Sequence, residues 1–165
     1  MNNRYSPHLL ILPEDEANEK IANGFTLNLQ VNERAIQILP RAGGGKVVVK
    51  KFIKDHAPKM RQYLERRFLL LIDFDKDRNL LPYIQNQIPE DVGDRVFVLG
   101  VFFEPEDLRK ALGMMSFESI GEALADNCAK NSDQLWQHDL LRHNQAEVER
   151  MIADVKPFLF GEGKS

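Results

Sequence analysis

Three aspartates follow the apolar run at residues 69–72, in the segment LLLIDFDKD. Carboxylate oxygens are the ligands that hard divalent cations such as Mg²⁺ and Mn²⁺ prefer. If the apolar run is a strand that continues to Asp75, Asp73 and Asp75 lie on the same side, about 7 Å apart. Their repulsion would raise their pKa values, and a bound cation would remove that cost. The spacing therefore predicts a metal site on Asp73 and Asp75, whereas Asp77 is more typical of a polar turn or helix cap.

Acidic residues also follow two other apolar runs. The run at 8–12 leads to Glu14, and the run at 95–101 leads to Glu104. If these runs are parallel strands, their carboxyl ends share one edge of the sheet, where open α/β proteins bind ligands. We therefore expect Glu14, Glu104 and the aspartate pair to lie along that edge.

A glycine run opens a helical pattern in PRAGGGKVVVKKF. Backbone amides at a helix start can hold an anion. The candidate phosphate-binding residues of this segment are Arg41, Gly43, Gly44, Gly45, Lys46 and Lys50. The segment is not a P-loop, because Val47 stands where a hydroxyl is required. A flexible connection is the alternative interpretation.

Positive charge is concentrated in one segment. The formal net charge is −3, yet residues 41–67 hold nine basic and two acidic residues, a local charge of +7. A basic segment on an acidic protein indicates a polyanion partner, and nucleic acid is the partner that we expect. A solvated helix face would have the same composition.

The order of apolar segments predicts the fold class. Continuous apolar runs at 8–12, 35–39, 68–72 and 95–101 are typical of buried strands, and helical periodicity separates them. This order predicts an α/β fold, a mainly parallel four-stranded sheet flanked by helices. Gly24 is expected to end the first helix, and Pro58 to kink or restart the basic one.

Helical patterns dominate after Val101, from residue 104 to 157. A length of 165 residues fits a single domain. Within that domain we expect an α/β core at 8–113 and a helical extension at 114–165, which covers one face of the sheet or lies beside it.

The lengths of the apolar runs and the single cysteine indicate the cellular environment of the protein. No apolar run approaches the roughly 20 residues that cross a bilayer, and the N-terminus lacks the long apolar region of a secretory signal. We expect no membrane association and a cytoplasmic protein. The single cysteine, Cys128, has helical spacing from Leu124 and is expected to be a buried, inert thiol.

The acidic elements together resemble the TOPRIM domains of topoisomerases, primases, OLD-family nucleases and small stand-alone relatives. Those domains carry a glutamate after a first strand, a glycine-containing region, and a DxD pair after a later strand. Glu14 resembles the glutamate, Asp73 and Asp75 the DxD pair, and Glu104 the acidic segment of the small relatives. The similarity spans roughly residues 8–113, and Asp15 stands where most such domains have glycine.

The resemblance implies metal-dependent phosphodiester chemistry on nucleic acid, as in a nuclease. Asp73 and Asp75 would hold Mg²⁺ or Mn²⁺, with Glu14 as a further ligand or as general acid/base. The basic helix would follow the nucleic-acid backbone without reading sequence.

Two other functions fit the same residues. A non-catalytic TOPRIM-like module would bind nucleic acid or a protein partner within an assembly, or form a homo-oligomer. A phosphatase of the haloacid dehalogenase type also uses a strand that ends in DxD. That family places the motif on its first strand and follows it with threonine or valine, where this chain has Asp77.

Overall fold

The computed structural model describes residues 5–132 and 134–160, and their fold is α/β, as the sequence predicts. All four strands of its sheet are parallel, in the order β2-β1-β3-β4. The strands are β1 (His8–Pro13), β2 (Ile36–Ile38), β3 (Arg66–Leu71) and β4 (Val96–Leu99).

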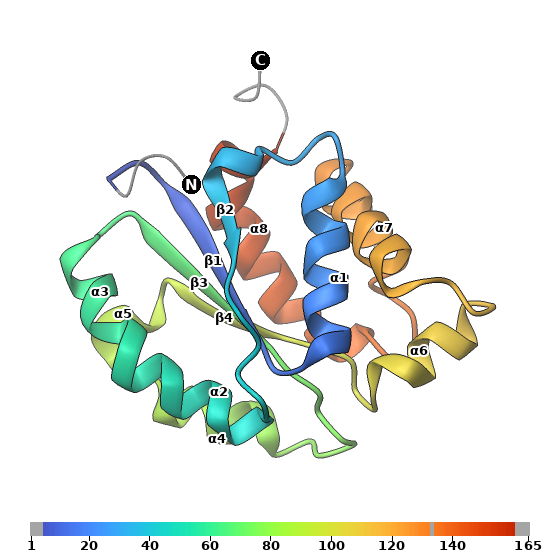
Figure 1. Cartoon of the computed structure of the whole chain (residues 1–165), viewed down its shortest axis with the longest axis horizontal. Coiled ribbons are helices and arrows are strands. Elements are labelled where there is room, and N and C mark those ends of the chain that lie inside the picture. Colours follow the sequence, from blue (N-terminus) through green and yellow to red (C-terminus); the bar gives the residue numbers. More distant parts are fainter. Residues whose placement is uncertain (1–4, 133, 161–165) are drawn as a thin grey trace.

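Helices cover both faces of this sheet (Figure 1). The α-helices are α1 (Glu16–Leu27), α2 (Gly45–Lys51), α3 (Ala57–Gln62), α4 (Leu80–Gln87), α5 (Glu90–Gly93), α6 (Pro105–Ala111), α7 (Phe117–Ala129) and α8 (Gln145–Leu159). Short helices of other types are η1 (Glu33–Ala35), η2 (Phe52–His56) and η3 (Arg142–Asn144). None of the helices in the described part of the chain is both long and apolar enough to cross a bilayer.

Side chains alternate between two apolar clusters, one on each face of the sheet. Leu9 and Leu69 face the cluster that contains α1, α7 and α8, whereas Leu10 and Leu70 face the cluster that contains α2, η2 and α4. Because α7 and α8 share a cluster with α1 and the sheet, the C-terminal helical segment covers one face of the sheet. Cys128 is buried in this cluster, and burial raises the pKa of its thiol to about 12.

Gly24 does not end the first helix, contrary to the sequence-based expectation. It lies inside α1, where a Cβ atom would come within 1.9 Å of the Glu118 carbonyl oxygen in α7. Gly121 of α7 makes the reciprocal approach, since its Cβ would lie 1.9 Å from the Ile21 carbonyl oxygen. The two glycines therefore allow the backbones of α1 and α7 to pack directly together.

The basic helix restarts near Pro58, as the sequence predicts: α3 begins at Ala57 and has Pro58 in its first turn. The helical backbone is nevertheless continuous from residue 45 to 62, and its middle, η2, is a π-helix in which Ala57 N–H bonds to Phe52 C=O. A proline lacks the N–H that an α-helix needs. The wider turn just before Pro58 is where the chain accommodates it.

Candidate functional site

The strand order defines one special position at the carboxyl edge of the sheet. The chain moves from β1 outward to β2, and later places β3 on the other side of β1. The point between β1 and β3 is therefore a topological switch point, where open α/β sheets form their ligand crevice. Glu14 and Asp15 directly follow β1, and Asp73 comes two residues after β3.

Three carboxylates converge at this switch point. One oxygen each from Glu14, Asp15 and Asp73 lies within 4.8 Å of the other two. The backbone of Glu14 extends the pairing of the strands, since its N–H donates to Leu71 C=O at 2.8 Å. Its side chain then accepts a hydrogen bond from Asp73 N–H at 2.9 Å. The predicted meeting of Glu14 with Asp73 is confirmed.

Asp15 and Asn18 complete the cluster, and neither was among the predicted metal ligands. Asp15 caps α1 by accepting a hydrogen bond from Asn18 N–H at 3.0 Å. The Asn18 side-chain amide donates to Asp15 Oδ1 at 3.0 Å and to Asp73 Oδ1 at 2.8 Å. An aspartate just before a helix, with asparagine three residues later, is a visible capping signal. The contact with Asp73 has no local signal.

Burial and mutual repulsion shift the protonation of these carboxyls. Burial is the main reason that the pKa of Asp73 rises to about 8; the Asn18 hydrogen bond opposes this rise, and Asp15 and Glu14 add to it. Burial also raises the pKa of Glu14, and the charges of Asp15 and Asp75 act in the same direction against the Asp73 N–H bond. At neutral pH the cluster therefore retains a proton on Asp73 unless a cation replaces it.

Basic side chains do not neutralise the cluster. Within residues 5–132 and 134–160, no lysine or arginine forms an ion pair with Glu14, Asp15 or Asp73. The nearby Arg41 guanidinium instead lies 3.7 Å from Glu16. Asp73 is buried, and Glu14 and Asp15 are half-buried, so their charges are offset by hydrogen bonds and not by a basic side chain of the described residues.

The other predicted acids lie outside the cluster. β3 ends at Leu71 and does not continue to Asp75, so the expected alternation of Asp73 and Asp75 along one strand is wrong. Asp75 is exposed at a turn with φ +49°, and it influences the cluster through its charge on Glu14. Asp77 accepts a hydrogen bond from Asn79 N–H, as a polar turn requires. Glu104 is exposed at the start of α6, where its N–H donates to Asp107.

The glycine segment lies beside the acidic cluster. Gly43 N–H donates to Glu14 C=O at 2.8 Å, so this amide is engaged within the protein. Gly43 has φ +100°, a conformation that glycine adopts without strain. A Cβ on Gly45 would lie 3.3 Å from Glu14 Oε1, so the start of α2 packs closely on the Glu14 carboxylate. Lys46 and Lys50 are exposed just beyond it.

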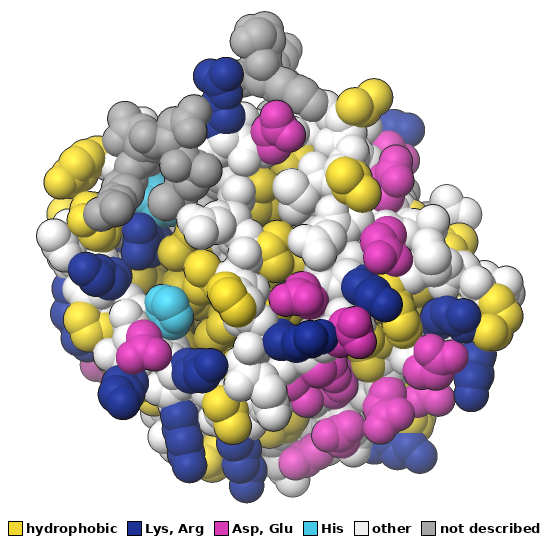
Figure 2. Space-filling view, in the orientation of Figure 1, with side chains coloured by type: hydrophobic (Ala, Val, Ile, Leu, Met, Phe, Trp, Pro, Cys, Tyr) yellow, Lys and Arg dark blue, Asp and Glu magenta, His cyan; other side chains and the backbone are white. Residues whose placement is uncertain are grey.

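Acidic and basic side chains occupy separate parts of the surface near the cluster (Figure 2). Acidic side chains gather around the start of α1 and around α6, and basic side chains lie over α2 and α3. The exposed basic residues of that helical segment are Lys46, Lys50, Lys51, Lys54, Lys59 and Arg61. Arg66 is buried and donates to His8 Nε2, so it does not contribute to the basic surface.

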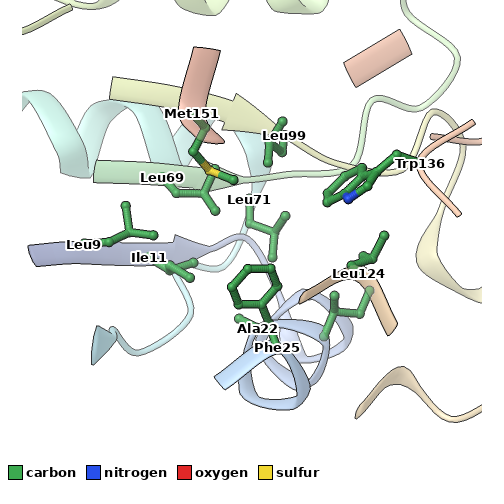
Figure 3. A pocket seen from close by; sticks show the side chains of 11 residues that line it. Leu9, Ile11, Ala22, Phe25, Leu69, Leu71, Leu99, Leu124, Trp136 and Met151 are labelled. Carbon is green, nitrogen blue, oxygen red and sulfur yellow. The ribbon is translucent and has the colours of Figure 1, made fainter. Parts of the chain in front are cut away.

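A separate cavity of about 40 Å³ lies between the sheet and α1, α7 and α8. Figure 3 shows Phe25, Leu71, Leu124 and Trp136 around it. Its lining is apolar throughout, and ligand sites need some polar groups to fix orientation. We interpret it as a packing defect of the core.

The arrangement is thus a three-layer α/β/α protein with a carboxylate cluster at the switch point of its sheet. No protein-family model, curated protein or solved structure matches this chain.

Proposed function

We propose that this protein performs divalent-metal-dependent phosphodiester chemistry on nucleic acid, as a nuclease-like protein of the TOPRIM type. The proposal rests on the convergence of Glu14 and Asp73, which follow two different strands, on a partly buried site without a cationic side chain from the described residues. Such a site is costly when its carboxylates are charged, and binding of a cation would offset that cost.

The donor set fits Mg²⁺ or Mn²⁺. Both ions take oxygen ligands at about 2.1 Å in near-octahedral geometry, so two ligand oxygens stand about 3–4.2 Å apart. The three carboxylate oxygens, all within 4.8 Å of one another, are compatible with that spacing. When bound, such an ion would stabilise charge on a phosphate and lower the pKa of a coordinated water.

The residues have distinct proposed roles. Asp73 and Asp15 would hold the cation, since Asn18 already fixes both side chains. Glu14 would be a further ligand or would move a proton, and its raised pKa brings it closer to the range that acid/base catalysis uses. Asp75 would act from outside as an exposed charge near Glu14.

Nucleic acid is the substrate that the surrounding surface favours. The basic face of α2, η2 and α3 begins beside Glu14, at Gly45 and Lys46. Arg41, Lys46 and Lys50 would contact phosphates, which positions a strand without reading its sequence.

The Asn18 contacts also favour a second candidate, a non-catalytic TOPRIM-like binding module. Asn18 holds Asp15 and Asp73 together, and a proton on Asp73 removes one of the charges that a cation would otherwise balance. A protein of this kind would keep the fold and the basic surface and would not bind metal at the cluster.

Calorimetric titration with Mn²⁺ distinguishes these candidates. Wild type should bind Mn²⁺ and, at pH 7, release close to one proton per ion, because Asp73 must lose its proton. Proton release is obtained from titrations in two buffers with different ionisation enthalpies. Asp73→Asn should abolish binding and Glu14→Gln should weaken it, whereas Asp77→Asn is the matched control and should bind normally.

The reaction is tested with Mn²⁺ and labelled DNA, RNA and a phosphomonoester. Cleavage of nucleic acid that Asp73→Asn loses and Asp77→Asn retains would support the nuclease. Turnover of the phosphomonoester alone would indicate a phosphatase. Absence of Mn²⁺ binding in wild type would reject the metal-dependent proposal and leave the binding module.

A further inference from the structure

Tyr83 places an exposed aromatic ring beside a lysine. Tyr83 lies in α4 with 46% of its surface exposed, although most large apolar and aromatic side chains of this protein are buried. The Lys46 ammonium stands over the ring, 5.8 Å from its centroid. Val47, 40% exposed, follows Lys46 in α2. A partly exposed aromatic ring and a positive charge therefore lie next to each other at the surface.

This pair stands next to the carboxylate cluster. Lys46 directly follows Gly45, which packs on Glu14 Oε1. The loop that carries Asp73 leads into α4, so Tyr83 also belongs to the carboxyl edge of the sheet. Ring, ammonium and carboxylates thus lie along one edge of the molecule.

A row of lysines continues from the pair. Lys46, Lys50 and Lys54 are spaced four residues apart in the continuous helical segment 45–62, and all three are exposed. Residues four apart lie on one helix face at a rise of about 6 Å. In the described part of the chain, none of the three forms an ion pair with an acidic side chain.

We propose that Tyr83 and Lys46 bind one nucleotide of a single-stranded nucleic acid, with the base stacked on the ring and a phosphate at the ammonium. The adjoining backbone follows Lys50 and Lys54. This inference rests on the proposed function for the reaction, and it names the substrate of the same site.

The proposed stacking on Tyr83 favours single-stranded over duplex nucleic acid. Bases in a duplex already stack on both faces, whereas an unpaired base can place its π-face on an aromatic side chain. Stacking accepts every base, and the lysine row contacts only phosphates, so binding should show little sequence preference. A nucleotide held by Tyr83 would bring a neighbouring phosphate toward Glu14 and Asp73.

Fluorescence anisotropy with labelled oligonucleotides tests the subsite. Single-stranded DNA, single-stranded RNA and a duplex of the same length are titrated in EDTA, so that binding does not depend on a metal. Tyr83→Ala should bind the single strands about 5- to 150-fold more weakly, and Tyr83→Phe, which keeps the ring, should bind like wild type. Lys46→Gln should reduce the slope of log affinity for single strands against log salt by about 0.7.

Tyr5 provides a matched control. It is 74% exposed and precedes β1, at the amino end of the strands. Tyr5→Ala removes an exposed tyrosine and should leave oligonucleotide binding unchanged. Thermal unfolding of each variant verifies that the fold is intact, which we expect because Tyr83 is exposed.

Each outcome decides between the two proposals. Equal affinity of wild type and Tyr83→Ala for single strands, or no binding by wild type, would overturn the subsite. If wild type cleaves nucleic acid with Mn²⁺ and Tyr83→Ala cleaves it equally well, the proposed function stands and the subsite is wrong. If single strands bind through Tyr83 but wild type neither binds Mn²⁺ nor cleaves, the subsite stands and the proposed function fails.

Discussion

The Asn18 side chain ties α1 to the segment after β3, because its amide donates to Asp73 Oδ1 at 2.8 Å across 55 residues of sequence. The same amide donates to Asp15 Oδ1 at 3.0 Å. Asn18 is fully buried, and Asp73 is only 8% exposed. One neutral side chain therefore sets the spacing between two carboxyl groups that would otherwise repel each other.

Replacement of Asn18 should destabilise the protein and disturb the cluster. Asn18→Ala removes both donated bonds and leaves Asp73 buried with one fewer partner, which should lower the free energy of unfolding by about 1–3 kcal/mol. Mn²⁺ affinity should fall as well, since Asp15 and Asp73 lose their common donor. Urea unfolding and calorimetry measure the two effects.

Asn28→Ala is the matched control for this experiment. Asn28 is buried at the end of α1, where its amide donates to Glu122 C=O, far from the carboxylates. This variant should lose stability and bind Mn²⁺ normally. Normal Mn²⁺ binding by Asn18→Ala as well would show that Asn18 stabilises the fold without positioning the site.

The raised pKa of Asp73 predicts how stability depends on pH. The folded protein holds this proton up to about pH 8, whereas the unfolded chain releases it near pH 3.8. The stability that this proton contributes is therefore fully present below about pH 4 and is lost as pH rises toward 8. Without a divalent ion, the free energy of unfolding should decrease over that range on account of Asp73.

Asp73→Asn isolates this effect from other titrating groups. Asparagine resembles the protonated acid, so the stability advantage of the variant over wild type should grow by more than about 1 kcal/mol between pH 5 and pH 8.5. Urea unfolding in EDTA measures the difference at each pH. A constant difference from pH 5 to 8.5 would contradict the raised pKa.

The close packing of α1 and α7 at Gly24 and Gly121 predicts that a side chain at either position destabilises the protein. An added methyl group at either glycine would meet a backbone carbonyl at 1.9 Å, and neither helix can move away without disturbing the core. Gly24→Ala and Gly121→Ala should each lower the free energy of unfolding by about 3 kcal/mol or more, above the usual cost of overpacking. Chemical denaturation provides the measurement.

Gly93→Ala serves as the control, because a Cβ at Gly93 would meet no heavy atom within 4 Å beyond its chain neighbours and the backbone of its own helix. Alanine also has the better helix propensity, so this variant should be as stable as wild type or slightly more stable. If all three variants behaved alike, the close approach of α1 and α7 would be wrong.

Local sequence patterns predict most of the fold. The four apolar runs predict the strands to within about two residues, because a strand of a parallel sheet is buried on both faces and needs a continuous apolar segment. Gly24 was misinterpreted, because local propensity makes glycine a helix breaker, whereas packing against α7 requires a glycine inside α1. The prediction for Pro58 agrees with the structure, since α3 begins at Ala57 after a π-helical turn.

The site was predictable only in outline. Glu14 and Asp73 follow strands whose carboxyl ends must share an edge, so their meeting could be inferred without coordinates. Asn18 joins them through a contact between distant segments that has no sequence pattern. Asp75 was placed beside Asp73 on the condition that β3 continued, but β3 ends at Leu71 and the backbone turns at Asp75 and Lys76, which have positive φ.

The outer edge of β4 is covered by side chains from the C-terminal helical segment. Gly100 N–H donates to Asn144 Oδ1 at 3.1 Å, and the Asn144 amide donates back to Gly100 C=O at 2.9 Å. Val98 N–H donates to Glu147 Oε1 at 3.1 Å. These bonds occupy backbone groups that an edge strand would otherwise offer to another chain.

Asn144→Ala should therefore weaken the fold and expose the edge. Two buried backbone groups of Gly100 lose their side-chain partner, at a cost of about 1–3 kcal/mol each, and the uncovered edge favours association between copies. Urea unfolding and light scattering on heating measure both effects. Gln145→Ala is the control, because Gln145 is exposed and donates only to Glu149 among the side-chain bonds of the described residues. Equal stability and equal scattering of the two variants would show that Asn144 does not protect the edge.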